Sequence, residues 1–136
     1  MKMEFDIASG DFKKAGRASS QIKKVLKQLQ VDPKIIKRIV VAIYEAEVNI
    51  VAHSFGGKLT AHINGNSIEV TLTDNGPGIK DIEQAMQEGF STASKEVRDM
   101  GFGAGMGLPN IRKNTDELNV TSEWGVGTTV WFRNQF

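Results

Sequence analysis

Half of the glycines in this chain fall within one quarter of its length. Residues 74–107 hold seven of the fourteen glycines and show little helical or strand periodicity apart from a short helix expected near 81–87. Loops of this length are uncommon inside a compact domain, and they are more often functional than connecting filler. We therefore predict that residues from about 80 to 107 form a lid, set between two regularly folded segments.

The two flanking segments contain helix and strand patterns. Two pairs of predicted strands are each joined by a tight turn, at Asn64-Gly65-Asn66 and at Trp124-Gly125-Val126-Gly127, which favours antiparallel pairing. The predicted strands are 3–7, 59–63, 68–72, 118–123 and 128–133. A first helix is predicted to follow capping residues at 9–11 and to end at about 30. Further helices are predicted at 33–52, 81–87 and 108–118. We expect one domain over 1–136 with an α+β fold, a two-layer sandwich whose mixed, mostly antiparallel sheet has helices on one face.

Composition excludes several classes of protein. The 17 basic and 16 acidic side chains give a net charge of +1, which argues against a dedicated nucleic-acid-binding domain and against binding to an anionic membrane. The absence of cysteine excludes disulfides and thiolate metal sites. The longest apolar run, 39–44, is too short to span a membrane, and the N-terminus is too polar for a signal peptide. We expect a soluble, cytoplasmic protein.

Three polar side chains recur on the second predicted helix. Glu45, Asn49 and His53 are spaced four residues apart, which places them along one stripe of the helix. A solvated polar face is one interpretation of this stripe. However, asparagine is a poor residue for the middle of a helix, and apolar residues surround this one. A carboxylate and an amide one turn apart can orient water and hold Mg²⁺ through oxygen, so the stripe is a candidate site.

A short turn with an aspartate and two glycines follows the strand at 68–72. Its sequence is Asp74-Asn75-Gly76-Pro77-Gly78, and because all of these residue types form turns, a plain turn is one interpretation. Glycines that flank a proline also suit a backbone held close to a flat ligand. The carboxylate of Asp74 can accept hydrogen bonds from an exocyclic amine of such a ligand.

A second glycine-rich run, Gly101-Phe102-Gly103-Ala104-Gly105-Met106-Gly107, leads into the helix at 108–118. Glycine-rich backbone before a helix offers unpaired N–H groups and the positive end of the helix dipole, which together bind anions. A flexible linker is the alternative, although ordering so many glycines costs entropy. The spacing matches neither the dinucleotide motif G-x-G-x-x-G nor the P-loop G-x-x-x-x-G-K-[ST].

In this order and at these spacings, the motifs resemble those of the Bergerat-type ATPases, the superfamily of gyrase, the heat-shock chaperone and sensor histidine kinases. Glu45-x-x-x-Asn49 resembles the N box, and Asp74-x-Gly76-x-Gly78 and Gly101 to Gly107 resemble the two glycine boxes. Gly125-Val126-Gly127-Thr128-Thr129 is similar to the last box. Within the superfamily, Glu45 and His53 make the chain most similar to the anti-sigma-factor serine kinases of bacteria. Ser54-Phe55 and a fuller lid depart from that subgroup.

The resemblance implies a role for each motif residue. Asp74 would accept the amino group of adenine, Gly78 would let the base approach, and Thr128 or Thr129 would lie at the adenine edge. Asn49 would bind the Mg²⁺ that bridges the phosphates of ATP, and Glu45 would be the general base. The remaining expected nucleotide contacts are His53, Gly76, Gly101, Gly103, Gly105, Met106, Gly107 and Leu108. Lys95 and Arg98 of the lid are candidates for contact with the γ-phosphate, but their spacing does not require it.

The resemblance leaves more than one activity open. The first is a serine/threonine protein kinase that uses ATP, releases ADP and phosphorylates an antagonist-type regulatory protein. The second is a binding module that sequesters a sigma factor or other regulator without significant kinase activity. Its candidate contact is the basic first helix, which carries Lys13, Lys14, Arg17, Lys23, Lys24 and Lys27. An ATPase that transfers to water is a third, and the resemblance allows a homodimer in each case.

Overall fold

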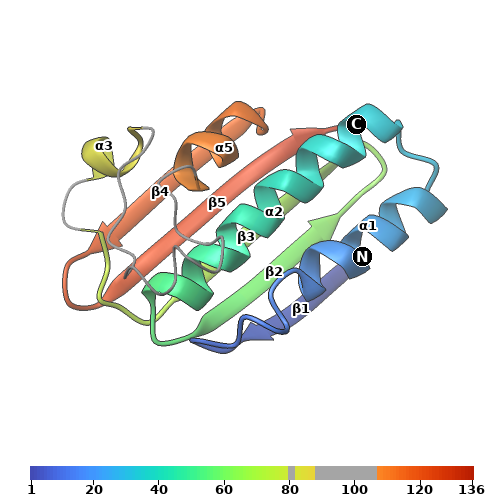
Figure 1. Ribbon diagram of the computed structural model, residues 1–136. Helices are drawn as coiled ribbons and strands as arrows, with labels where there is room; N and C mark the ends of the chain where they lie inside the picture. The colour runs from blue at the N-terminus through green and yellow to red at the C-terminus, as the bar shows by residue number, and fades with distance from the viewer. Residues whose placement is uncertain (80–81, 88–106) are drawn as a thin grey trace.

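One antiparallel sheet organises the molecule (Figure 1). The computed structural model describes residues 1–79, 82–87 and 107–136. The strands are β1 (Lys2–Ile7), β2 (Gly57–Ile63), β3 (Ser67–Asp74), β4 (Glu117–Glu123) and β5 (Gly127–Gln135), and the helices are α1 (Arg17–Gln28), α2 (Pro33–His53), α3 (Ile82–Ala85) and α5 (Gly107–Lys113). The strand order is β1-β2-β3-β5-β4, and each pairing is antiparallel.

The helices lie on one face of the sheet, as the sequence predicted (Figure 1). α2 crosses the middle of that face, with α1 packed on one side of it and α5 on the other. Strand residues alternate between the two faces, so every second side chain of β2, β3 and β5 meets the helices. The core residues on these strands are Leu59, Ala61, Ile63, Ile68, Val70, Leu72, Val130 and Phe132. The predicted two-layer α+β sandwich is therefore confirmed.

The opposite face of the sheet is polar. It carries threonines from four strands, all at least partly exposed: Thr60, Thr71, Thr73, Thr121 and Thr129. Thr129 of β5 pairs with Thr73 of β3 on one side and with Thr121 of β4 on the other. Its side chain is therefore on the face away from the helices, whereas that of its neighbour Thr128 is on the helix face.

The first helix begins later than the sequence predicted. It starts at Arg17, after Gly16 in a left-handed conformation (φ 93°), and Phe12 lies outside it. The N-terminal turn of α1 is held by a side chain from α2: the carboxylate of Glu47 accepts hydrogen bonds from the backbone N–H groups of Gly16 (3.1 Å), Ala18 (3.3 Å) and Ser19 (3.0 Å). A helix begins with unpaired N–H groups, and here a distant residue satisfies them.

Glu47 is only 3% exposed. Because its buried carboxylate accepts these three backbone N–H groups, Glu47 has a structural role. Burial raises the pKa of its carboxyl group above the usual value, and the three backbone N–H groups act in the opposite direction. The sequence spacing places Glu47 off the stripe of Glu45 and Asn49. In the structure it contacts the start of α1 instead.

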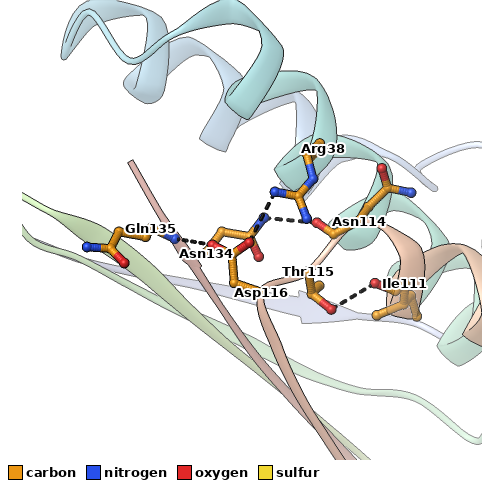
Figure 2. Close-up of polar contacts among 7 residues, drawn as sticks. All are labelled: Arg38, Ile111, Asn114, Thr115, Asp116, Asn134 and Gln135. Carbon is orange, nitrogen blue, oxygen red and sulfur yellow. Dashed lines mark hydrogen bonds and ion pairs between the residues drawn. The ribbon is translucent and has the colours of Figure 1, made fainter.

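The C-terminal end of α5 is anchored to the sheet (Figure 2). The helix ends at Lys113 rather than near 118, because the side chains of Asn114 and Thr115 bond back to the carbonyls of the preceding turn. Asn134 of β5 donates to the carbonyl of Asn114 (2.9 Å). Asp116 then accepts from Arg38 of α2 (3.1 Å) and from the backbone N–H of Gln135 (2.8 Å), so α2, α5 and β5 meet at one point.

In the part of the chain that the structure describes, no helix combines the length and apolarity needed to cross a bilayer.

We predict that Glu47→Ala lowers the free energy of unfolding by about 3 kcal/mol, because it leaves three backbone donors at the start of α1 without their acceptor. Urea unfolding followed by circular dichroism measures the change. Glu117→Ala is the matched control, since Glu117 is exposed on β4 and surface substitutions usually change stability by about 0.5 kcal/mol or less. Equal effects of the two substitutions would contradict the structural role of Glu47.

Candidate functional site

Three chain segments converge at one end of the sheet. They are the loop after α2, the turn after β3 and the turn between β4 and β5. Backbone hydrogen bonds join them: Phe55 N–H donates to the carbonyl of Gly76 (3.2 Å), Gly76 N–H to that of Val126 (2.6 Å), and Gly125 N–H to that of Pro77 (2.5 Å). The candidate residues of the first glycine box and of the last box are therefore held next to one another.

Asp74 stands at the end of β3 with its side chain on the helix face. Its Oδ1 accepts a hydrogen bond from the backbone N–H of Thr128 (3.0 Å). Burial raises the pKa of the Asp74 carboxyl group, and the bond from Thr128 acts in the opposite direction. Of the two predicted threonines, the structure places Thr128 beside Asp74 and Thr129 on the opposite face of the sheet. A half-buried carboxylate with one oxygen fixed is suited to accept a hydrogen bond from a ligand amine at the other.

The glycines of this region are required by backbone packing. A Cβ on Gly78 (φ 87°) would lie 2.5 Å from the carbonyl oxygen of Glu123, and one on Gly76 would lie 3.2 Å from that of Val126. At Gly127 a Cβ would overlap the carbonyl oxygen of Asp74. These contacts give Gly76 and Gly78 a structural explanation that does not depend on a ligand. Of the three motif residues in this box, Asp74 is therefore the one that indicates ligand binding.

Ser122 is a polar residue of the site that the sequence analysis missed. Its hydroxyl oxygen accepts from the backbone N–H of Ile79 (2.6 Å), lies 2.9 Å from the Thr128 hydroxyl and donates to the carbonyl of Gly127 (3.1 Å). It thereby fastens the turn after β3 to the β4–β5 hairpin. No local sequence pattern indicates this role, because Ile79 lies 43 residues away along the chain.

The stripe on α2 faces α5. Glu45, Asn49 and His53 are all half-buried, and His53 is the last residue of the helix. Gly107, the first residue of α5, lies against the amide of Asn49: a Cβ there would be 2.7 Å from Asn49 Oδ1. One turn further along α5, Asn110 Nδ2 donates to Glu45 Oε1 (3.3 Å). Asn110 was also missed by the sequence analysis.

The remaining predicted contacts divide into two groups. Leu108 is 7% exposed and belongs to the hydrophobic core, which places its side chain among apolar neighbours. The other predicted residues lie outside the described part of the chain: Gly101, Gly103, Gly105, Met106, Lys95 and Arg98. The predicted lid, about 80–107, is likewise outside it apart from residues 82–87 and Gly107.

The side chains on this stripe fit Mg²⁺ that is held partly by the phosphates of a nucleotide. Among the described residues there is no cluster of three or more histidine, cysteine, aspartate or glutamate side chains that could hold a metal ion. Mg²⁺ is usually held by one or two protein oxygens together with substrate phosphates. The Asn49 amide oxygen beside the backbone of Gly107, with Glu45 one turn away, fits that arrangement.

Comparison with known sequences identifies related proteins. A family model described as histidine kinase-, DNA gyrase B- and HSP90-like ATPase matches residues 34–136. The chain is 41% identical over 108 residues to the anti-sigma F factor of Thermoanaerobacter sp. (strain X514), covering 74% of this chain and 72% of that protein. It is 33% identical over 104 residues to the serine/threonine-protein kinase RsbT of Bacillus subtilis (strain 168), covering 71% and 72%.

Solved structures share the fold. The crystal structure of the RsbU and RsbW domains of a Mycobacterium tuberculosis protein matches 98% of this chain and 32% of that chain, with a TM-score of 0.66 at 19% identity. This chain therefore corresponds to about a third of that one. The SiaB–SiaC complex from Pseudomonas aeruginosa matches 98% of this chain and 89% of that chain, with a TM-score of 0.57 at 13% identity. At these identities the likeness shows the fold alone.

We predict that Gly78→Ala lowers the free energy of unfolding by about 2 kcal/mol or more, because it combines a left-handed conformation with a backbone overlap. Gly65→Ala is the control, since a Cβ on Gly65 would have no neighbour within 4 Å. Urea unfolding of both variants measures the difference. A Gly78→Ala protein as stable as Gly65→Ala would contradict the close approach of this turn to Glu123.

Proposed function

The chain belongs to the family of histidine kinase-, DNA gyrase B- and HSP90-like ATPases, as its motifs predicted, and from this membership we propose that it is an ATP-dependent serine/threonine protein kinase of the anti-sigma-factor type. The proposed substrate is a serine or threonine of an antagonist-type regulatory protein. The observation that carries the proposal is the position of Glu45: half-buried on α2, one helical turn from Asn49 and facing α5. The relatives named anti-sigma F factor and serine/threonine-protein kinase support it.

We assign the adenine to the end of the sheet where Asp74 and Thr128 meet. The backbone N–H of Thr128 donates to Oδ1 of Asp74. We propose that Oδ2 accepts a hydrogen bond from the amino group of adenine. A hydrogen bond to a charged acceptor contributes about 1.5–3 kcal/mol. Thr128, rather than Thr129, is the threonine whose side chain lies on this face. Ser122 supports the site by holding the turn after β3 against the hairpin.

We assign the phosphates to the region of Asn49 and the start of α5, the helix that follows the second glycine box in the sequence. When bound, Mg²⁺-ATP supplies the γ-phosphoryl group and the metal that neutralises its charge. Asn49 would hold the metal through its amide oxygen, with the backbone of Gly107 beside it. The backbone N–H groups of Gly101, Gly103 and Gly105 are the proposed phosphate donors, and His53 is a proposed contact one turn beyond Asn49.

Glu45 is the proposed general base. Its carboxylate would take the proton of the incoming serine or threonine hydroxyl as the oxygen attacks the γ-phosphorus, while the bond from that phosphorus to the β–γ bridging oxygen breaks and ADP leaves. Phosphoryl transfer depends mostly on positioning and charge neutralisation, so one carboxylate within hydrogen-bond reach of the hydroxyl is sufficient as a base. The same arrangement would hydrolyse ATP if water took the place of the hydroxyl.

We predict that Asp74→Asn weakens ATP binding by about 10- to 100-fold, equivalent to about 1.5–3 kcal/mol. The Asn side chain can still accept the bond from Thr128 N–H at Oδ1, but it presents an NH₂ group to the amine of the base. Titration calorimetry with ATP and Mg²⁺ measures the affinity. Asp6→Asn is the matched control, because Asp6 is exposed on β1; unchanged affinity in Asp74→Asn would overturn the assignment of the adenine site.

We predict that Glu45→Gln retains ATP affinity and loses phosphoryl transfer by about 100-fold or more, as expected for removal of a general base. The measurement uses γ-labelled ATP, Mg²⁺, the purified protein and a lysate of its source organism. A small labelled protein that appears with the wild type and with the control Glu117→Gln, but not with Glu45→Gln, would establish the kinase and name its substrate. Undiminished labelling by Glu45→Gln would exclude Glu45 as the base.

A partner-sequestering module is the second candidate function, and the surface charge favours it. α1 contains no acidic residue, and six basic side chains on and just before it are exposed: Lys13, Lys14, Arg17, Lys23, Lys24 and Lys27. Such a surface suits an acidic partner protein, for which a sigma factor is one candidate. No labelled protein in the presence of intact ATP binding would favour this function over the kinase.

A further inference from the structure

We propose that Asn110 is a positioning residue for Glu45, through which α5 sets the orientation of the proposed base. The inference rests on the proposed function of Glu45 and goes beyond it by naming the residue that holds it. Asn110 Nδ2 donates to Glu45 Oε1 at 3.3 Å, across 65 residues of sequence. Both side chains are half-buried, in the space where α2 and α5 pack together.

A neutral donor is suited to this task. A glutamate side chain has several rotatable bonds, and a reacting group displaced by about 1 Å can lose about 100-fold in rate. A lysine or arginine at position 110 would also fix the carboxylate, but the ion pair would stabilise its charge and reduce its basicity. The amide of Asn110 holds Oε1 with a weaker, uncharged donor. Oε2 is then the oxygen that we assign to the substrate hydroxyl.

The geometry of the two helices couples Glu45 to the nucleotide end of the site. Gly107 of α5 lies against Asn49, and Asn110 of α5 contacts Glu45. The two helices therefore run antiparallel along this contact. Gly107 lies beside Asn49, the proposed metal ligand, and Asn110 lies one turn further along, beside Glu45, the proposed base. The far end of α5 is anchored through Asn114 to the sheet. A nucleotide that positions Gly107 would position Asn110 with it.

The isosteric substitution Asn110→Asp separates positioning from packing. It retains the shape of the side chain but replaces the amide donor with a carboxylate that repels Glu45. We expect the turnover rate at saturating ATP, measured as labelled acceptor protein and as phosphate released, to fall about 10-fold or more, while the Kd for ATP measured by calorimetry changes by less than about twofold. Asn110→Ala should behave in the same way, and Asn119→Asp is the control, because Asn119 is exposed on β4.

A second measurement does not depend on activity. In ¹⁵N-labelled protein, the side-chain amide resonances of Asn110 should shift when Glu45 is replaced by Gln, because the acceptor changes from a carboxylate to an amide, whereas those of Asn119 should not. The absence of this shift would overturn the proposal, as would full turnover by Asn110→Asp. A wild type that binds ATP but transfers nothing would refute the kinase function, and the amide shift would still show whether Asn110 holds Glu45.

Discussion

The burial of one face of α2 on the sheet is the constraint on which the rest of the structure depends. Ile39, Ile43 and Ile50 on that face are at most 3% exposed, and full burial of such a side chain contributes about 1.5–3 kcal/mol. Because this apolar face sets the rotation of the helix about its axis, it also sets the directions of the other side chains. α1 and α5 pack on either side of α2 (Figure 1), and each meets a different polar residue of it.

Two glutamates two positions apart on α2 have different environments for this reason. Residues i and i+2 point about 200° apart around a helix, so Glu47 faces α1 and Glu45 faces α5. Glu47 accepts three backbone N–H groups and begins the neighbouring helix. Within residues 1–79, 82–87 and 107–136, the hydrogen bond that Glu45 accepts comes from the side-chain amide of Asn110, and a carboxylate can accept further hydrogen bonds. Residue type alone does not distinguish a structural glutamate from a proposed base. The distinction comes from the number and kind of hydrogen-bond donors around each carboxylate.

The end of the sheet to which we assign the nucleotide is held together mainly by backbone hydrogen bonds. The sequence makes Gly76 and Gly78 compatible with the close approach of a flat ligand. However, the backbone of Glu123 already excludes a Cβ on Gly78, and the carbonyl of Val126 leaves little room for one on Gly76. For Asp74, the described residues provide the bond from Thr128 N–H and no comparable close packing of the backbone. The case for adenine therefore depends on that carboxylate and on membership of the ATPase family, with the glycines providing the tight turn that brings Asp74 to the site.

The sequence by itself determined the features that depend on near neighbours. Periodicity predicted the strands and α2, and the order and spacing of Glu45-x-x-x-Asn49 and Asp74-x-Gly76-x-Gly78 predicted the ATPase family. The late start of α1, the position of Thr128 rather than Thr129 on the helix face, and the contacts of Glu47, Ser122 and Asn110 were decided by tertiary structure. Three of these depend on hydrogen bonds between residues about 30 to 65 positions apart. Local sequence patterns carry no information on such contacts, because packing of the helices on the sheet brings their partners together.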